Sequence, residues 1–411
     1  MKTPHKFLRA LPLVMATGLL STLQGCSSGK ASMTVSGGSG SLGTYQITAW
    51  GDSLTQGDED SSGISFPNQL AKMTGQTVNN LGVGAQTSSQ IAVRINAYAG
   101  QPEQTFAAGF TLPTSGTVNV TFQTGFEPVN AQYRPAYPNG VPLSFTVAGQ
   151  TWTGNVIQTG TSDVFTPAAY PPAPVAVPAG TAWTVVIPAE VSSGCMVIWA
   201  GRGNYLNSAR VQEDIAAMVA ALQQSTSCYL VMSIPNGEYP FEWKGTEDYN
   251  KIVALDNALS ATYSPGNHYL DIRSALVALY NPNNPADVMD HNNDVPPYSL
   301  RAQNMPGSLT SPIASPATCS FTVDPAQTAG RIISLDAELI LIAGGTDGDY
   351  ICTRGFAGTA PETYASGTAM TGVNAIHPGQ NSQSSLNPKY TNGFVAVAAQ
   401  VYAWLQANGP K

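Results

Sequence analysis

Two side chains with the chemistry of a covalent hydrolase lie far apart in the sequence, Ser53 and His377. Ser53 ends the run Ile-Thr-Ala-Trp-Gly-Asp-Ser, in which a short apolar stretch of strand type stops at a tight turn. A serine at the carboxyl end of a buried strand, on a turn that opens toward a helix, lies where open α/β sheets bind ligands. His377 lies in Asn-Ala-Ile-His-Pro, ahead of a predicted amphipathic helix over 394–407, and is the one histidine of the four in such a context. A hydroxyl beside an imidazole base predicts acyl transfer through a covalent acyl-enzyme.

These motifs resemble the blocks of the GDSL/SGNH family of serine ester hydrolases. The Gly-Asp-Ser-Leu run matches the first block, whose nucleophile would be Ser53. Residues 80–88 match the second block, residues 198–205 the third, and residues 374–377 the Asp-x-x-His block that carries the base. The resemblance implies a three-layer, flavodoxin-like α/β hydrolase with a parallel sheet, which needs no cofactor.

The same resemblance implies three donors for the oxyanion: the N–H of Ser53, the N–H of Ala85 and the side chain of Asn204. Ala85 stands where the family has glycine, and its backbone can donate if its φ is negative. Asn204 lies one place later than the family's asparagine, and Gly203 occupies the expected position. We expect the flexibility of Gly203 to let Asn204 reach the oxyanion. Asp52 is expected to brace the turn and to take no part in proton transfer.

Asn374 is the most serious departure from the family pattern, which has aspartate there. A carboxylate would fix the imidazole tautomer and stabilise the imidazolium, whereas an amide cannot do the second. In the serine-protease template the change costs ~10⁴-fold in rate. The sequence leaves four alternatives open: Asn374 itself orients His377, a backbone carbonyl holds the ring and leaves a Ser–His dyad, the enzyme is slow or inactive, or a carboxylate approaches from Asp287, Asp290 or Asp294.

Strand and helix patterns alternate along much of the chain, which predicts a parallel sheet with helices on both faces. The predicted strands cover residues 45–50, 77–81, 196–200, 229–234 and 268–272. The predicted helices cover residues 65–73, 88–98, 208–223, 246–261 and 394–407.

Two β-rich segments interrupt this alternation. Residues 101–192 show short alternating stretches and almost no helical period, which predicts an inserted β-sandwich-like domain. Residues 303–370 are predicted to form a second, small β-module, and Thr-Arg-Gly-x-x-Gly-Thr over 353–359 resembles a module of phage tail and other virion proteins. That resemblance implies a surface-presenting or glycan-contacting module; the alternative is a long decorative loop. The hydrolase is then split into residues 44–100, 193–302 and 371–411.

The first residues have the pattern of a bacterial lipoprotein signal peptide over 1–25. A positive start and a short apolar stretch precede Leu-Gln-Gly-Cys, which resembles a lipobox with the lipidated residue at Cys26. Residues 26–43 are then a Gly/Ser-rich flexible tether. This pattern predicts a lipid anchor to the membrane of the cell envelope, with outer-membrane sorting if the cell is Gram-negative.

Composition excludes several classes of function. The net charge is −8 over 411 residues, and the basic residues form no stripe along the sequence. Both observations argue against a nucleic-acid partner. No Cys-x-x-Cys motif or histidine cluster indicates a metal site. Besides Cys26, four cysteines allow two disulfides in three connectivities. Cys319 and Cys352 are a plausible pair, while Cys195 and Cys228 each begin an apolar run and are compatible with buried thiols.

The sequence therefore predicts an envelope-anchored carboxylic ester hydrolase of the SGNH type. The flanking β-modules favour an acetyl or short-acyl ester of a polysaccharide as its substrate. The alternative is a catalytically weakened SGNH scaffold that acts as a glycan- or surface-binding lipoprotein, because three block positions depart from the family pattern: Ala85, Gly203 and Asn374.

Overall fold

The computed structural model describes residues 45–57, 63–132, 136–222 and 228–410. All of them belong to one compact unit, Ser41–Lys411. The predicted signal peptide over 1–25, the lipidation site Cys26 and the tether over 26–43 lie outside the described residues. Within the described ranges, no helix is both long enough and apolar enough to cross a membrane.

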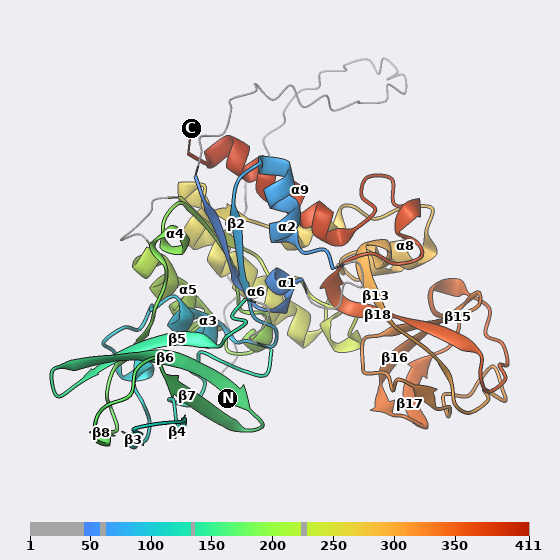
Figure 1. Cartoon of the computed structure of the whole chain (residues 1–411). Coiled ribbons are helices and arrows are strands. Elements are labelled where there is room, and N and C mark those ends of the chain that lie inside the picture. The colour runs from blue at the N-terminus through green and yellow to red at the C-terminus, as the bar shows by residue number, and fades with distance from the viewer. Residues whose placement is uncertain (1–44, 58–62, 133–135, 223–227, 411) are drawn as a thin grey trace, which may run out of the picture. The chain divides into compact units, whose positions relative to one another are not determined.

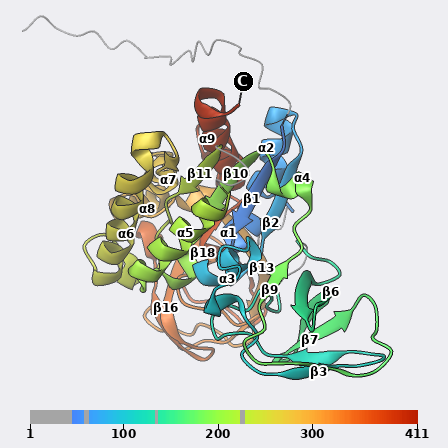
Figure 2. The same cartoon turned by 90° about the vertical axis from the view of Figure 1, so that its left-hand side faces the viewer.

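A five-stranded parallel sheet forms the centre of the predicted hydrolase part (Figure 1 and Figure 2). Its order is β12-β11-β10-β1-β2, with these bounds: β1 Ile47–Gly51, β2 Val78–Gly82, β10 Cys195–Trp199, β11 Tyr229–Met232 and β12 Tyr269–Leu270. Every residue of β1 and β10 is buried, as expected for parallel strands covered on both faces. The predicted α/β class with a parallel sheet is confirmed.

Helices cover both faces of this sheet. The first face packs on the apolar sides of α2 Phe66–Thr74, α7 Ile272–Val277 and α9 Gly393–Asn408. The second packs on α3 Ser88–Arg94, α5 Ser208–Leu222 and α6 Glu247–Tyr263. The remaining α-helices are α1 Ser53–Gln56, α4 Ala189–Ser192 and α8 Pro285–Asn292. The sequence predicted α2, α3, α5, α6 and α9, and missed the short helices α1, α4, α7 and α8.

The chain order of the central strands fixes where a site can form. β1 lies between β2 and β10, so the connection from β1 to β2 and the connection from β10 to β11 run in opposite directions across the sheet. In open α/β sheets this reversal opens a crevice at the carboxyl ends of the two strands. Ser53 directly follows β1 at that position.

The first insertion contains two antiparallel sheets that share one apolar core. The smaller sheet pairs β3 Phe110–Leu112 with β8 Val175–Val177. The larger has the order β4-β7-β6-β5-β9, with β4 Val118–Val120, β5 Val141–Val147, β6 Gln150–Thr159, β7 Ser162–Pro167 and β9 Trp183–Val185. All of these strands fall within the predicted segment 101–192.

The second module is one six-stranded antiparallel sheet of order β14-β13-β18-β15-β16-β17. Its strands are β13 Arg301–Leu309, β14 Val323–Asp324, β15 Ile332–Leu335, β16 Glu338–Thr346, β17 Asp349–Thr353 and β18 Ala369–Pro378. The predicted limits of 303–370 are too narrow, because β18 pairs with both β13 and β15 through residue 373 and meets Arg301 again at Pro378. The sequence had assigned most of β18 to the third hydrolase segment.

Two disulfides stabilise the chain. The predicted pair Cys319–Cys352 is present in the second module. Cys195 and Cys228, for which the sequence left buried thiols open as an alternative, form the other disulfide. They lie at the starts of two adjacent parallel strands, β10 and β11, where the sheet brings them together.

Candidate active site

The turn after β1 presents Ser53 as the first residue of α1. Asp52 caps this helix, since its Oδ1 accepts a hydrogen bond from the N–H of Leu54 at 3.0 Å. Gly51 leaves no room for a side chain, because a Cβ there would collide with the carbonyl oxygen of Trp199 and the hydroxyl of Thr55. Close packing of β1, β10 and α1 therefore fixes the turn. Asp52 braces it, as the sequence predicts.

His377 reaches Ser53 from the carboxyl end of β18. Its Nε2 lies 2.7 Å from the Oγ of Ser53, across a sequence separation of 324 residues. The histidine is buried, with 9% of its surface exposed, whereas Ser53 is partly exposed and accessible to a substrate. The structure thus brings together the two residues that the sequence selected.

Asn374 is the hydrogen-bond partner of the other imidazole nitrogen. Its Oδ1 lies 3.0 Å from Nδ1 of His377 and also accepts the backbone N–H groups of Ile376 and His377, each at 2.8 Å. Two backbone donors require an oxygen at this position, which settles the orientation of the amide. Nδ1 must then carry the proton, and Nε2 presents its lone pair to Ser53.

The three alternative carboxylates are bound to other residues. Asp287 accepts from the N–H and Oγ–H of Ser299 and from the N–H of Asn281. Asp290 pairs with Arg301, and Asp294 pairs with Arg273. Of the arrangements left open by the sequence, the structure has the one in which Asn374 orients the ring.

A buried arginine that the sequence analysis missed supports the loop of the base. Arg301 Nη1 donates to the carbonyl oxygens of Asn374 and Ala375 at 3.2 and 3.1 Å, while Nη2 faces Asp290 at 2.9 Å and Glu238 at 3.4 Å. Arg301 and both carboxylates are fully buried. Burial, opposed by Arg301 and reinforced by Glu238, raises the pKa of Asp290 well above its usual range. Arg301 carried no motif in the sequence, since only the fold places it behind the base.

The second-block turn departs from the expected backbone geometry. Ala85 has a φ of 59°, so the condition of a negative φ under which its N–H could serve as a donor is not met. The turn is held by its neighbour Gly84, whose N–H donates to the side chain of Gln56 and whose carbonyl accepts from Nδ2 of Asn130 at 2.7 Å. Ala85 itself is exposed, and none of the described residues accepts a hydrogen bond from its N–H.

The side chain of Asn204 is held by Ser88. Its Oδ1 accepts the N–H of Ser88 and its Nδ2 donates to the Ser88 hydroxyl, both at 3.0 Å. Within the described residues, no hydrogen bond joins Asn204 to Ser53. Gly203 explains the displaced asparagine, because a Cβ at 203 would lie 2.8 Å from the carbonyl oxygen of Gln86. Asn204 therefore ties the loop after β10 to the first turn of α3, and the flexibility expected of Gly203 is not used to bring it to the nucleophile.

A second buried arginine supports the floor of the site. Arg94 donates to the carbonyl oxygens of Gly51 and Leu81 at 3.0 and 2.7 Å, linking the carboxyl ends of β1 and β2. Burial raises the pKa of Asp52 to about 6, although the N–H of Leu54 and the charges of Arg202 and Arg94 act in the opposite direction.

The first insertion contributes one wall of this region. The carbonyl of Pro128 accepts from the side chain of Gln86 at 3.3 Å, and Asn130 binds Gly84 as described above. The side chain of Gln132 lies where a Cβ on Gly84 would be, so this glycine permits the close approach. The loop over 128–132 thus packs directly against the second-block turn.

Within the described part of the chain, no group of three or more His, Cys, Asp or Glu side chains is arranged to hold a metal ion. Comparison of the chain with protein-family models, with curated proteins and with solved structures gives no match.

Proposed function

We propose that this protein is a serine ester hydrolase of the GDSL/SGNH type, acting through an acyl-enzyme. The observation that carries the proposal is the continuous relay from Ser53 Oγ through His377 to Asn374 Oδ1, with distances of 2.7 and 3.0 Å. The order of the strands in the central sheet supports it as well. Numbered along the chain, the five strands lie in the order 2-1-3-4-5, which is the order of flavodoxin-like sheets, and such sheets bind ligands after the first strand.

In the proposed mechanism Ser53 Oγ attacks the acyl carbonyl while its proton passes to Nε2 of His377. The N–H of Ser53 is the candidate donor to the resulting oxyanion, whereas Ala85, with its positive φ, does not meet the condition for donation. His377 then returns the proton to the departing alcohol as the tetrahedral intermediate collapses to an acyl-serine. Water, deprotonated by the same nitrogen, releases the carboxylic acid and restores Ser53.

We extend the proposal to an acetyl or short-acyl ester of a polysaccharide as substrate and to a lipid anchor at Cys26 in the cell envelope. The loop over 128–132 beside the turn at 84–86 supports a substrate that contacts an inserted module as well as the nucleophile. The two disulfides support an oxidising compartment.

A second candidate function is a glycan- or surface-binding lipoprotein with weak or no catalysis. The observation that favours it is the engagement of Asn204 by Ser88, which leaves no side-chain donor assigned to the oxyanion. Loss of one such donor typically costs about 2.7–4 kcal/mol of transition-state stabilisation.

Hydrolysis of p-nitrophenyl acetate by the purified protein tests the proposal. Ser53→Ala should lower kcat by about 10³-fold or more, because the remaining site lacks the nucleophile. The exposed serine variant Ser385→Ala is the matched control and should retain full activity. A fluorophosphonate should label wild-type protein at Ser53, and His377→Ala should react far more slowly. Equal rates for wild type and Ser53→Ala, without a fluorophosphonate adduct, would leave the binding protein as the function.

A further inference from the structure

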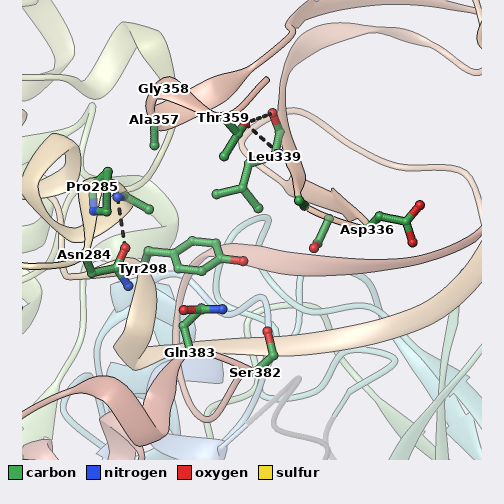
Figure 3. A pocket seen from close by; sticks show the side chains of 13 residues that line it. Asn284, Pro285, Tyr298, Asp336, Leu339, Ala357, Gly358, Thr359, Ser382 and Gln383 are labelled. Atoms are coloured by element: carbon green, nitrogen blue, oxygen red, sulfur yellow. Dashed lines mark hydrogen bonds between the residues drawn. The ribbon is translucent and has the colours of Figure 1, made fainter. Parts of the chain in front are cut away.

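A cavity of about 270 Å³ lies where the hydrolase part meets the second module (Figure 3). The hydrolase part contributes the start of α8 and Tyr298, and the module contributes the β15–β16 turn and residues 357–359. The segment after β18 completes the wall with Ser382 and Gln383. Neither Ser53, His377 nor Asn374 lines this cavity.

Two polar groups in the wall have unused hydrogen-bonding capacity. Tyr298 is only 1% exposed, and its hydroxyl points into the cavity without a hydrogen-bond partner among the described residues. Nδ2 of Asn284 is likewise buried without a partner, while the Oδ1 of this residue caps α8 by accepting from the N–H of Ala286. A hydroxyl group of an occupant would give the Tyr298 hydroxyl a hydrogen-bond partner, whereas Nδ2 of Asn284 is enclosed by protein and out of its reach.

The other lining groups define the chemistry of that occupant. Gln383, Ser334 and Ser382 are further polar residues that line the wall. Apolar surface comes from side chains such as Leu339 and from the Tyr298 ring. Such a mixture suits a ring with polar edges and apolar faces.

The charge of the lining residues and the volume of the cavity restrict the kind of ligand further. None of the lining residues is basic, so the cavity offers no partner for a phosphate, sulfate or carboxylate. Asp336 is the one acidic lining residue, and Figure 3 shows its carboxylate turned away from Tyr298. Pockets for drug-sized ligands measure about 300–1,000 Å³, so this smaller cavity suits a single ring.

We propose that this cavity binds one neutral sugar residue, as a recognition site separate from the catalytic relay. The inference goes beyond the proposed esterase chemistry, because it depends on the Tyr298 cavity and not on the Ser53–His377 pair. The Tyr298 hydroxyl and the Gln383 amide would bind sugar hydroxyls, and Leu339 would contact the apolar face of the ring.

Saturation-transfer NMR and calorimetry on the full protein test this site. The probes are the methyl glycosides of glucose, galactose, N-acetylglucosamine and N-acetylgalactosamine, with glucuronic acid and glucose 6-sulfate as charged comparisons. At least one neutral glycoside should bind, and both charged sugars should bind more weakly. Tyr298→Phe and Gln383→Ala should each raise its Kd about five-fold, the loss of one hydrogen bond.

Gln380→Ala is the matched control, because Gln380 is exposed in the same segment but lines a different cavity. It should leave the Kd unchanged. Absence of binding by every neutral sugar, tighter binding of the charged sugars, or a Kd insensitive to Tyr298→Phe would each overturn the proposal. Ser53→Ala should bind the glycoside as wild type does, so a failure of the esterase proposal and a failure of this one give different results.

Discussion

Asn374 performs one of the two tasks that a carboxylate would perform beside His377. In the serine-protease template, replacing aspartate by asparagine is costly largely because the histidine takes the wrong tautomer. Here the backbone N–H groups of Ile376 and His377 hold the amide oxygen toward Nδ1 and prevent that outcome. The second task needs a negative charge to stabilise the imidazolium, and the amide of Asn374 carries none.

We therefore expect Asn374→Asp to raise kcat/KM about 10- to 100-fold, less than the ~10⁴-fold of the template, because the tautomer is already correct. The added carboxylate also favours the imidazolium, so the acid limb of the pH–rate profile should move to higher pH. Steady-state kinetics from pH 5 to 9 would measure both effects. Asn374→Ala, which removes the acceptor, should lower kcat/KM. An unchanged rate and pH profile for Asn374→Asp would show that the charge has no part in catalysis.

The carboxyl group of Asp52, in the turn before Ser53, should make the unfolding free energy depend on pH. The pKa of Asp52 is about 6 in the folded protein, above the 3.8 of an ordinary aspartate, so the folded protein binds more protons than the unfolded chain between these pH values. Stability from this group is complete below about pH 4 and decreases as the pH rises through 6. The loss amounts to about 3 kcal/mol for a shift of this size.

In Asp52→Asn the amide keeps an acceptor for the N–H of Leu54 but cannot ionise. The unfolding free energy of this variant should decrease less than that of wild type between pH 4 and 7, as measured by urea denaturation. The exposed Asp336→Asn should follow the wild-type curve. Parallel curves for wild type and Asp52→Asn would contradict the assignment.

At the scale of the element, β18 decides the geometry of the site. The strand pairs with β13 and β15 inside the second module and ends with His377 and Pro378 beside the nucleophile. Arg301, the first residue of β13, binds the carbonyls of Asn374 and Ala375 and so fixes the end of β18. The base is therefore positioned by module strands as much as by the central sheet.

The disulfide of the second module should stabilise the fold and have no effect on catalysis. Removing Cys319–Cys352, which spans 33 positions, by a double serine variant should lower the unfolding free energy by about 3–4 kcal/mol. Cys352 lies in β17, which is three strands away from β18 in the sheet. At a low temperature, at which the double serine variant is still folded, its kcat/KM should therefore equal that of wild type. Denaturation curves and low-temperature kinetics would check this.

The double serine variant of Cys195 and Cys228 is the matched comparison, because this disulfide spans the same separation but lies in the central sheet. It should destabilise the protein to a similar degree. Loss of activity in folded Cys319/Cys352 variant protein would contradict the expectation.

The elements show where sequence patterns are informative. β1, β10 and β11 coincide with buried apolar runs, so they were predictable to within a few residues. β2 and β12 are only partly buried, and they too were predicted to within a few residues. β18 was not, because its pairing with β13 and β15 joins distant segments and periodicity carries no signal for such pairing. Arg301 and Arg94 escaped notice for the same reason, since each acts through backbone carbonyls that only the tertiary structure brings near.

At the scale of the whole molecule, the two insertions differ in their relation to the site. The first contributes a loop beside the turn at 84–86, whereas the second contains the strand that carries the base. The sequence identified both insertions and the distant pair Ser53 and His377. It did not reveal the displacement of Asn204 toward Ser88, because a one-residue offset in a loop depends on packing against Gln86.

We expect the esterase activity to disappear when the second module unfolds. In a urea series, ester hydrolysis should decline at the concentration at which the amides of β13 and β18 begin to exchange with solvent. Hydrogen-exchange mass spectrometry and activity measured on the same samples would test this. Amide exchange in β6 and β7 of the first insertion serves as the reference. Full activity in protein whose β13–β18 pairing has opened would contradict the expectation.

The continuity of β18 limits how this protein can be shortened or recombined. A strand that starts inside an accessory module and ends with the proton acceptor cannot be excised by joining its flanks, as a surface loop can. Any truncation that removes the module must supply a new β-ribbon to hold the imidazole in place. Exchange of the module between related chains would likewise alter the position of His377, so the proposed sugar site and the proposed catalytic pair can only be exchanged together.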